Sequence, residues 1–464
     1  MRSLLVLLIL ALGLGAYVYF VEAKRDPDAA TKKDKVFTVE TGKIDQVDVR
    51  AASGEVTTVK KQGDKWQVTA PISAAADQSA VTALVSTIET LEAQKTLEEN
   101  PASVSAYGLE PARFSVAFKL AGDAATHRLN VGNRTPTGSD VYARVDGQPK
   151  LFLLSAYLED SLNRTTFSLR DKTALTFPPD TTDAMTVEAP GSPVVTLSRK
   201  DNTWQLTAPA AARADYAAVD GMVSRLSQLQ MKSIVSDAAP SPKDMTTYGL
   251  DKPKLLVTVG SGSSRAALAI GANKDDATVY ARDVSKPMVF TVDASALADL
   301  DKKADDLRVK DVFDFKPFSA VSLDVTSGGT TTSFAKSTVP APPAPAPVAG
   351  GATPPAEPAA PTELWKQTKP AAKDVNQTAM TDLLNSLSSL KATSFTTKPM
   401  GSGEQTVVVA RYGEPASATD ERVTFIKSGD VVQAVRSTEP GAAIVPTADF
   451  DKALNQLKAL TATK

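Results

Sequence analysis

The chain offers few residues from which a catalytic or metal site could be assembled. It has one histidine, His127, and no cysteine in 464 residues, which excludes thiol nucleophiles, disulfides and cysteine-based zinc sites. Arg170 beside Asp171 is typical of a salt bridge or a cap, and Arg144 and Arg282 fall in alternating strands where such a side chain faces solvent. The sequence has no Gly-rich phosphate loop, nucleophile elbow or His-Glu-x-x-His motif. We therefore expect no catalytic residues, no cofactor and no metal.

Length and composition indicate several folded units. A chain of 464 residues exceeds the ~250–300 residues at which a single core stops growing. Hydrophobic residues make up 42% and charged residues 22% of the chain, as in globular proteins. The formal net charge of −2 gives no electrostatic reason to expect nucleic acid as a partner.

The N-terminus predicts a membrane anchor. Residues 4–23 form an apolar run of twenty residues interrupted by Glu22, and a helix of that length spans ~30 Å, the thickness of a bilayer's hydrocarbon core. A cleaved signal would have a shorter apolar region of ~7–15 residues and a small-x-small cleavage site. We expect an uncleaved transmembrane anchor at residues 1–25, which holds the chain in a bacterial inner membrane, and a polar tether at residues 26–35.

The orientation of this anchor has two interpretations. More basic residues follow the run than precede it, which favours a cytoplasmic location for the bulk of the chain. A short basic head before an apolar run is also the usual export signal. We expect a single-pass protein with the bulk of the chain in the periplasm.

The rest of the chain contains three copies of one unit. The sequence WQVTAP at residues 66–71 recurs as WQLTAP at 204–209 and, more weakly, as WKQTKP at 365–370, at offsets of 138 and 161. Each copy continues with five apolar residues at i, i+3, i+4, i+7 and i+10, the spacing of one helical face. These are Val81, Leu84, Val85, Ile88 and Leu91; Val219, Met222, Val223, Leu226 and Leu229; and Met380, Leu383, Leu384, Leu387 and Leu390. Asp77, Asp215 and Asn376 precede the three helices as N-caps.

Two further patterns recur in the first two copies. Asn100-Pro101 and Ser241-Pro242 predict a short capped helix, which a Tyr-Gly-Leu sequence ends at residues 107–109 and 248–250. The sequence VYAR at residues 141–144 recurs at 279–282. The functional alternative is a candidate interaction surface built from the tyrosines and arginines of these patterns: Tyr107, Tyr142, Arg144, Tyr248, Tyr280 and Arg282.

Strand-like alternation around each helix predicts an α+β fold made of three tandem repeats, each a mostly antiparallel sheet with a helix, behind the transmembrane helix. We place copy 1 at residues 36–175, copy 2 at 176–315 and the divergent copy 3 at 316–464. Residues 339–361 contain nine prolines and one charge, Glu357. Because the other copies have a tight turn at this point, we interpret the segment as an insertion at a hairpin tip.

The motif order, with a Val-Gly or Ile-Gly turn at residues 131–132 and 270–271 before VYAR, resembles the bacterial family known as domain of unknown function 4340. The closing sequence FSLRDK at residues 167–172 is similar to that family's closing motif and is echoed at 307–311. The resemblance covers residues 36–315 well and copy 3 poorly. It implies a membrane-anchored protein with its domain outside the inner membrane, often accompanying ABC-type transport systems linked to gliding motility. It implies no catalytic residues.

These observations favour a non-enzymatic, membrane-anchored periplasmic scaffold or accessory protein of an ABC-type transport or motility complex, with protein partners in the cell envelope. The alternative is a periplasmic module that binds a solute or the cell wall, with a pocket between copies lined by Tyr107, Tyr142 and Arg144 or their second-copy equivalents. An envelope hydrolase is a third hypothesis.

Overall fold

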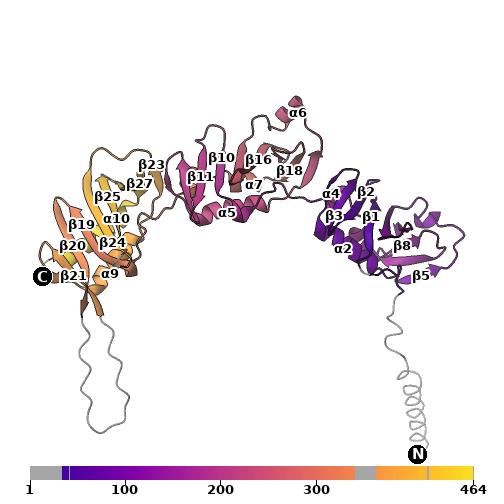
Figure 1. The fold of residues 1–464 in the computed structure, drawn as a ribbon, viewed down its shortest axis with the longest axis horizontal. Coiled ribbons are helices and arrows are strands. Elements are labelled where there is room, and N and C mark those ends of the chain that lie inside the picture. Colours follow the sequence, from indigo (N-terminus) through magenta and orange to yellow (C-terminus); the bar gives the residue numbers. More distant parts are fainter. Residues whose placement is uncertain (1–33, 41, 340–361, 415–416, 463–464) are drawn as a thin grey trace, which may run out of the picture. The chain divides into compact units, whose positions relative to one another are not determined.

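The computed structural model describes residues 34–40, 42–339, 362–414 and 417–462. These residues form three nine-stranded antiparallel sheets with helices, and the strand order is the same in each sheet (Figure 1). The predicted α+β fold with three repeated units is therefore confirmed. The predicted anchor lies outside the described residues. Within them, no helix combines the length and the apolar character that crossing a bilayer requires.

The strands of the three copies are as follows. Copy 1 contains β1 (Ile44–Arg50), β2 (Val56–Gln62), β3 (Lys65–Ala70), β4 (Ala74–Ala75), β5 (Lys95–Glu98), β6 (Phe114–Leu120), β7 (Thr126–Arg134), β8 (Asp140–Val145) and β9 (Leu151–Ser155). Copy 2 contains β10 (Ala184–Glu188), β11 (Val195–Lys200), β12 (Thr203–Ala208), β13 (Ala212–Arg213), β14 (Ser233–Ser236), β15 (Leu255–Ser261), β16 (Ser264–Asn273), β17 (Thr278–Asp283) and β18 (Val289–Asp293). Copy 3 contains β19 (Ala320–Ser327), β20 (Thr330–Val339), β21 (Thr362–Lys369), β22 (Lys373–Asp374), β23 (Ser394–Thr396), β24 (Glu404–Tyr412), β25 (Thr419–Ser428), β26 (Val431–Arg436) and β27 (Ala442–Val445).

The helices accompany these strands. Copy 1 has α2 (Gln78–Glu89), α3 (Glu159–Leu162), α4 (Thr166–Leu169) and the 3-10 turns η2 (Ser105–Tyr107) and η3 (Ala156–Leu158). Copy 2 has η4 (Pro179–Thr181), α5 (Tyr216–Ser227), α6 (Pro242–Thr247), α7 (Ser295–Leu300) and α8 (Ala304–Leu307). Copy 3 has η5 (Pro317–Ser319), α9 (Gln377–Ser388) and α10 (Thr447–Thr461).

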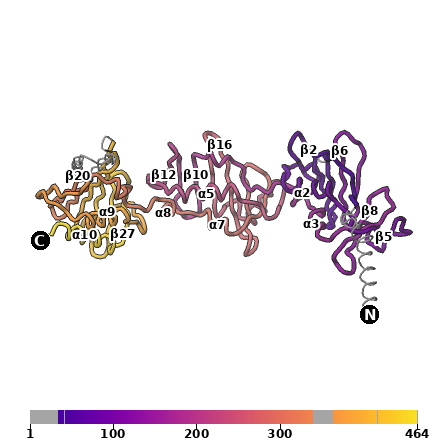
Figure 2. The backbone as a smooth tube through the Cα atoms, turned by 90° about the horizontal axis from the view of Figure 1, so that it is seen from below, coloured from indigo at the N-terminus to yellow at the C-terminus, as the bar shows by residue number. Residues whose placement is uncertain are grey.

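The topology explains why each sheet has a long helix between its two edge strands. In copy 1 the strand order is β4-β3-β2-β1-β6-β7-β8-β9-β5, so β4 and β5 are the two edge strands. Because α2 connects β4 to β5, the chain must cross one face of the sheet between its two edges, and α2 lies on that face. In copy 2, α7 and α8 contact α5 (Figure 2). In copy 3 the single long helix α10 packs beside α9 instead (Figure 1).

The predicted helix faces are confirmed for four of the five apolar positions in each copy. Val81, Leu84, Val85 and Ile88 are buried in α2, and the matching residues are buried in α5 and α9. The fifth position was wrongly placed on the helix, because each helix ends before it. Leu91, Leu229 and Leu390 are buried in an extended segment. Their carbonyls accept hydrogen bonds from the N–H groups of Val36, Ala174 and Val312, the entering residues of each copy.

The N-caps and the tryptophans also repeat. Asp77, Asp215 and Asn376 each accept a hydrogen bond from the backbone N–H three residues on, as predicted. Trp66, Trp204 and Trp365 are buried at the same position of the third strand, where each pairs across the sheet with Lys61, Arg199 or Lys336. The three tryptophans therefore occupy equivalent environments.

The proline-rich insertion lies at a hairpin tip, as predicted. Strands β20 and β21 pair up to Val339 and Thr362, and residues 340–361 between them lie outside the described residues. The equivalent hairpins of copies 1 and 2 close at Gln62 with Lys65 and at Lys200 with Thr203.

The chain divides into two compact units, Met1–Lys172 and Thr173–Lys464. The first unit contains copy 1, and the second contains copies 2 and 3. Thr173 pairs with Gln230 in copy 2, and Asp311 pairs with Lys391 in copy 3.

The capped helix before Tyr-Gly-Leu is confirmed in copy 2 and wrong in copy 1. Ser241 caps α6 together with Asp244, and Pro242 occupies the first turn. In copy 1 the residue equivalent to Asp244 is Ser103, whose hydroxyl accepts from the Ser105 N–H instead. Without the carboxylate of the capping box, only the 3-10 turn η2 forms.

The glycines that follow Val131 and Ile270 let the Tyr-Gly-Leu loop approach the sheet. A Cβ on Gly132 would lie 2.2 Å from the carbonyl oxygen of Tyr107, and one on Gly271 would lie 2.1 Å from that of Tyr248. In both cases the nearest atom belongs to the backbone, so a side chain at either glycine would collide with the loop. The residue at this position of copy 3 is Ile426, and copy 3 has no Tyr-Gly-Leu sequence.

We predict opposite effects for two Gly→Ala substitutions in copy 2. Gly271→Ala should lower the free energy of unfolding by about 1–3 kcal/mol, because the loop must move away from the new methyl group. Gly221→Ala should raise it by about 0.5–1 kcal/mol, because Gly221 lies in α5 with open space around it. Urea unfolding of the full chain, with hydrogen exchange to locate the change, measures both. A stabilising Gly271→Ala would contradict the packing described here.

Candidate functional site

The predicted interaction residues are brought together within each copy. The rings of Tyr107 and Tyr142 lie 4.8 Å apart in copy 1, and those of Tyr248 and Tyr280 lie 4.6 Å apart in copy 2. In β8, Val141 and Ala143 face the helix-side core, so Tyr142 and Arg144 face the opposite side of the sheet. The tyrosine pairs therefore hold the Tyr-Gly-Leu loop on this outer face.

The two predicted arginines make the same hydrogen bond to the backbone in copies 1 and 2. Arg144 Nε donates to the carbonyl of Gln148 at 2.9 Å, and Arg282 Nε donates to the carbonyl of Lys286 at 2.9 Å. These carbonyls lie in the turns that follow β8 and β17. Tyr107 donates its hydroxyl proton to Glu98 at 2.8 Å, and this bond raises the pKa of Tyr107 above 10.0. All six residues are partly exposed, so an interaction surface at this place stays a prediction.

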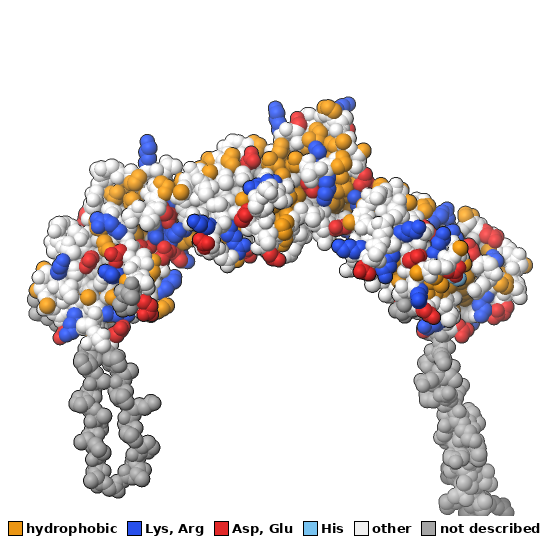
Figure 3. Space-filling model, in the orientation of Figure 1, with side chains coloured by type: hydrophobic (Ala, Val, Ile, Leu, Met, Phe, Trp, Pro, Cys, Tyr) orange, Lys and Arg blue, Asp and Glu red, His pale blue; other side chains and the backbone are white. Residues whose placement is uncertain are grey.

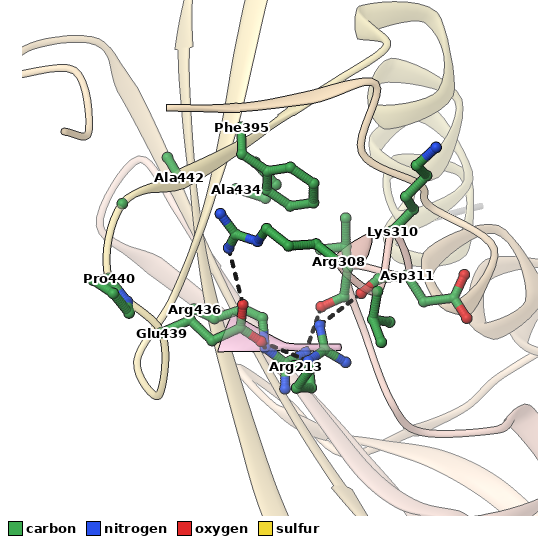
Figure 4. Close-up of a pocket in the computed structure, with 14 residues that line it drawn as sticks. Arg213, Arg308, Lys310, Asp311, Phe395, Ala434, Arg436, Glu439, Pro440 and Ala442 are labelled. Atoms are coloured by element: carbon green, nitrogen blue, oxygen red, sulfur yellow. Dashed lines mark hydrogen bonds and ion pairs between the residues drawn. The ribbon is translucent and has the colours of Figure 1, made fainter. Parts of the chain in front are cut away.

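Hydrophobic side chains gather near α6 and β18 on the face shown in Figure 3. Their core is Leu250, Ala269 and Val289, on which Tyr248 and Tyr280 pack. The solute-binding alternative predicted a pocket between copies that such tyrosines would line. One pocket where copies 2 and 3 meet has a different lining, which includes Arg308, Arg436 and Glu439 (Figure 4).

Copies 2 and 3 are joined by one continuous backbone segment with no linker. Val309 N–H donates to the carbonyl of Arg213 in copy 2, at 3.0 Å. One residue later, the carbonyl of Lys310 accepts from Ala392 in copy 3, at 2.7 Å. Successive residues are thus hydrogen-bonded to different copies, which restricts rotation between them.

Three arginines and three carboxylates surround this segment: Arg213, Arg308 and Arg436 with Asp314, Glu421 and Glu439. We call them the junction cluster. Its formal charges balance, three positive against three negative. Every arginine pairs with at least one of the carboxylates.

Glu439 is the centre of the junction cluster. Its carboxylate accepts from Arg213 at 2.5 Å and from Arg308 at 3.1 Å, and it lies 3.4 Å from Arg436 Nε. The Glu439 side chain is 11% exposed. The Arg308 guanidinium also stacks on Phe395, with its carbon 3.7 Å from the ring centre (Figure 4).

Glu421 fixes the start of copy 3. It pairs with Arg436 and accepts backbone hydrogen bonds from Asp314 at 2.9 Å and Phe315 at 3.2 Å. Arg436 in turn donates to the carbonyl of Val312 at 2.6 Å. The cluster thus binds backbone as well as side chains, so it determines how the entering strand of copy 3 lies.

The pocket within the cluster is small. Its volume is about 20 Å³, enough for one water molecule, which needs ~10–15 Å³. Sites for small organic ligands measure ~300–1,000 Å³. A second pocket of about 350 Å³ is also lined in part by Arg213 and Glu439. Because the charged groups of the cluster pair with one another, we interpret the cluster as a structural joint.

Copy 1 contains a separate buried carboxylate, Glu159, between Arg113 and Arg134. Arg113 hydrogen-bonds to Glu159, and Arg134 Nε lies 2.8 Å from its other oxygen. The bond from Arg113 lowers the pKa of Glu159, burial opposes this, and Arg134 reinforces it, so the pKa stays below 4.5. Arg113 Nε also donates to the carbonyl of Gly132, which links this group to the packing of the Tyr-Gly-Leu loop.

Sequence reasoning missed the junction cluster. Its members are separated by up to 226 residues and follow no motif spacing. One signal was present, because charged residues replace small or uncharged ones at equivalent positions of the repeats. Arg213 matches Ala75 in copy 1, Asp314 matches Thr176, and Glu421 matches Ala266 in copy 2.

Comparison with known proteins identifies the family. The family model described as "Domain of unknown function (DUF4340)" matches residues 66–205 and 204–406, more than half of the chain. The chain belongs to the DUF4340 family. The second DUF4340 match continues into copy 3, further than the motifs alone indicated. No curated protein and no solved structure matches the chain.

We predict that Glu439→Gln lowers the free energy of unfolding of copies 2 and 3 by about 3 kcal/mol, because it leaves the buried Arg308 without a carboxylate. Hydrogen exchange should show the largest loss of protection at residues 307–315. The matched control is Glu363→Gln, which removes an exposed carboxylate 3.4 Å from Lys336 and should cost less than ~1 kcal/mol. Equal effects of the two substitutions would contradict a structural role for the cluster.

Proposed function

We propose that this DUF4340 protein is a non-enzymatic scaffold or accessory protein of an ABC-type transport or motility complex. It would be anchored in a bacterial inner membrane by residues 4–23, with the bulk of the chain in the periplasm. The observation that carries the proposal is the junction cluster. Its charged groups are paired with one another across copies 2 and 3, so they fix two repeats as one body.

Repetition of one unit supports the same proposal. Tandem repeats create a large surface without a central cavity, and such surfaces suit protein contacts. A rigid joint between two repeats holds the surface residues of both repeats at fixed distances from one another. One partner can then bind to both repeats at once without a further cost of ordering them. The apolar run at residues 4–23 supports the membrane location.

The location is tested by protease treatment of intact spheroplasts. The sequence predicts neither a helix nor a strand in residues 340–361. We therefore expect an added protease to cleave there first. We expect cleavage there from outside the cell, and protection would move the bulk of the chain to the cytoplasm. Deletion of residues 4–23 should release the chain from the membrane fraction.

The partner is tested by cross-linking the tagged chain in membranes before detergent extraction. We expect recovery of a permease or an ATP-binding subunit of a transporter together with the chain. A variant without residues 4–23 is the control and should lose these partners. Recovery of the chain alone, from membranes in which it is intact, would contradict the scaffold proposal.

A further inference from the structure

Copy 3 has a groove beside its tryptophan, Trp365. It lies between η5, β20, β21 and α9 and has a volume of about 510 Å³, within the ~300–1,000 Å³ of ligand sites. Trp365 and Leu384 are buried at its base. Lys336 and Glu363 form a polar rim, 3.4 Å apart.

Phe318 makes one wall of this groove and is 82% exposed. A phenylalanine gains ~1.5–3 kcal/mol when it is fully buried, so leaving it in water forgoes that stabilisation. Pro317 and Leu364, which also line the groove, are partly exposed, so Phe318 belongs to a small apolar patch beside polar residues of the lining. Such a surface indicates a binding site more strongly than an isolated exposed side chain.

The equivalent positions in copies 1 and 2 have no such wall. Gly42 and Asp180 stand where copy 3 has Phe318. In copy 2, Arg199 lies 5.9 Å from the rings of both Trp204 and Tyr216. Trp204 is 1% exposed. In copy 3, Lys336 lies 5.8 Å from the Trp365 ring, Gln377 stands in place of the tyrosine, and Trp365 is 6% exposed.

The proline-rich insertion is the second feature that only copy 3 has. It ends at residue 361, and Glu363, Leu364 and Trp365 line the groove directly after it. Trp365 lies four positions after residue 361, a span of at most ~14 Å in an extended chain. The two features therefore occur in the same copy and meet at the same strand.

The chemistry of the two features matches. Proline-rich chains favour a polyproline II helix, whose rings bind in grooves lined by aromatic side chains. Residues 340–361 contain nine prolines and a single charge, and the groove is lined by the exposed Phe318 with Trp365 beneath it. A segment tethered beside its site has an effective concentration in the millimolar range. This favours the chain's own segment over a second copy or a foreign peptide.

We propose that the groove lined by Phe318 and Trp365 binds the chain's own proline-rich segment, residues 340–361. The first test places the photo-cross-linker p-benzoylphenylalanine at position 318 of the full chain. Mass spectrometry should find cross-links to residues 340–361 in a chain of monomer mass. The matched control is the same cross-linker at position 180 in copy 2, which should not reach the segment.

Three outcomes would overturn the proposal: cross-links only in a chain of dimer mass, cross-links only to another protein, and no cross-link at all. The first would identify a second copy as the occupant, and the second would identify a foreign partner.

A second test uses a variant in which Gly-Asp, the turn of the equivalent copy 1 hairpin, replaces residues 340–361. A fluorescent peptide of residues 339–361 should bind this variant at least tenfold more tightly than it binds the full chain, in which the tethered segment competes. Phe318→Asp in the same variant, the residue that copy 2 has, should weaken binding at least tenfold. Absence of peptide binding to the shortened variant would contradict the proposal.

Discussion

Burial of one helix face against one sheet is the constraint on which the rest of the structure depends. In each copy the helix connects the two edge strands, so four apolar side chains on its inner face must cover the sheet. The buried tryptophan of the third strand lies beside it, and the leucine beyond the helix receives the entering strand through its carbonyl. The same few residues therefore close the core and determine where each copy begins. This arrangement explains why the Trp motif and the helix pattern recur together along the chain.

The charged chemistry of copies 2 and 3 follows from that arrangement. Once the entering strand of copy 3 is fixed at Val312 and Leu390, the residues on either side of it are brought close to copy 2. Arg213, Arg308 and Arg436 meet three carboxylates there. A buried ion pair adds little net stability compared with apolar packing, but loss of one partner is costly. The cluster is thus suited to specify one geometry between two copies, which is the property a scaffold needs.

The sequence predicted what repeats and missed what differs between the repeats. The helix faces, the N-caps and the hairpin insertion follow local periodicity and turn chemistry, so three copies reinforced each prediction. The helix before Tyr107 was wrong, because the copies differ at one capping residue, Ser103 in place of Asp244. The junction cluster and the Phe318 groove depend on residues far apart in the chain, and no local pattern brings them together. In the sequence, both the junction cluster and the Phe318 groove are indicated only by residues that differ from those at the equivalent positions of the other copies.

Distance measurement between copies 2 and 3 tests the central claim most directly. The chain has no cysteine. Spin labels can therefore be attached selectively to the variant with Ala217→Cys in α5 and Asp382→Cys in α9. A label pair within copy 2, at Ala217 and Val194, supplies the width expected for a rigid unit. Pulsed electron resonance should give a single distance between the copies, with a distribution as narrow as that of the reference pair. A broad or multiple distribution in the unsubstituted cluster would contradict the account of copies 2 and 3 as one rigid body.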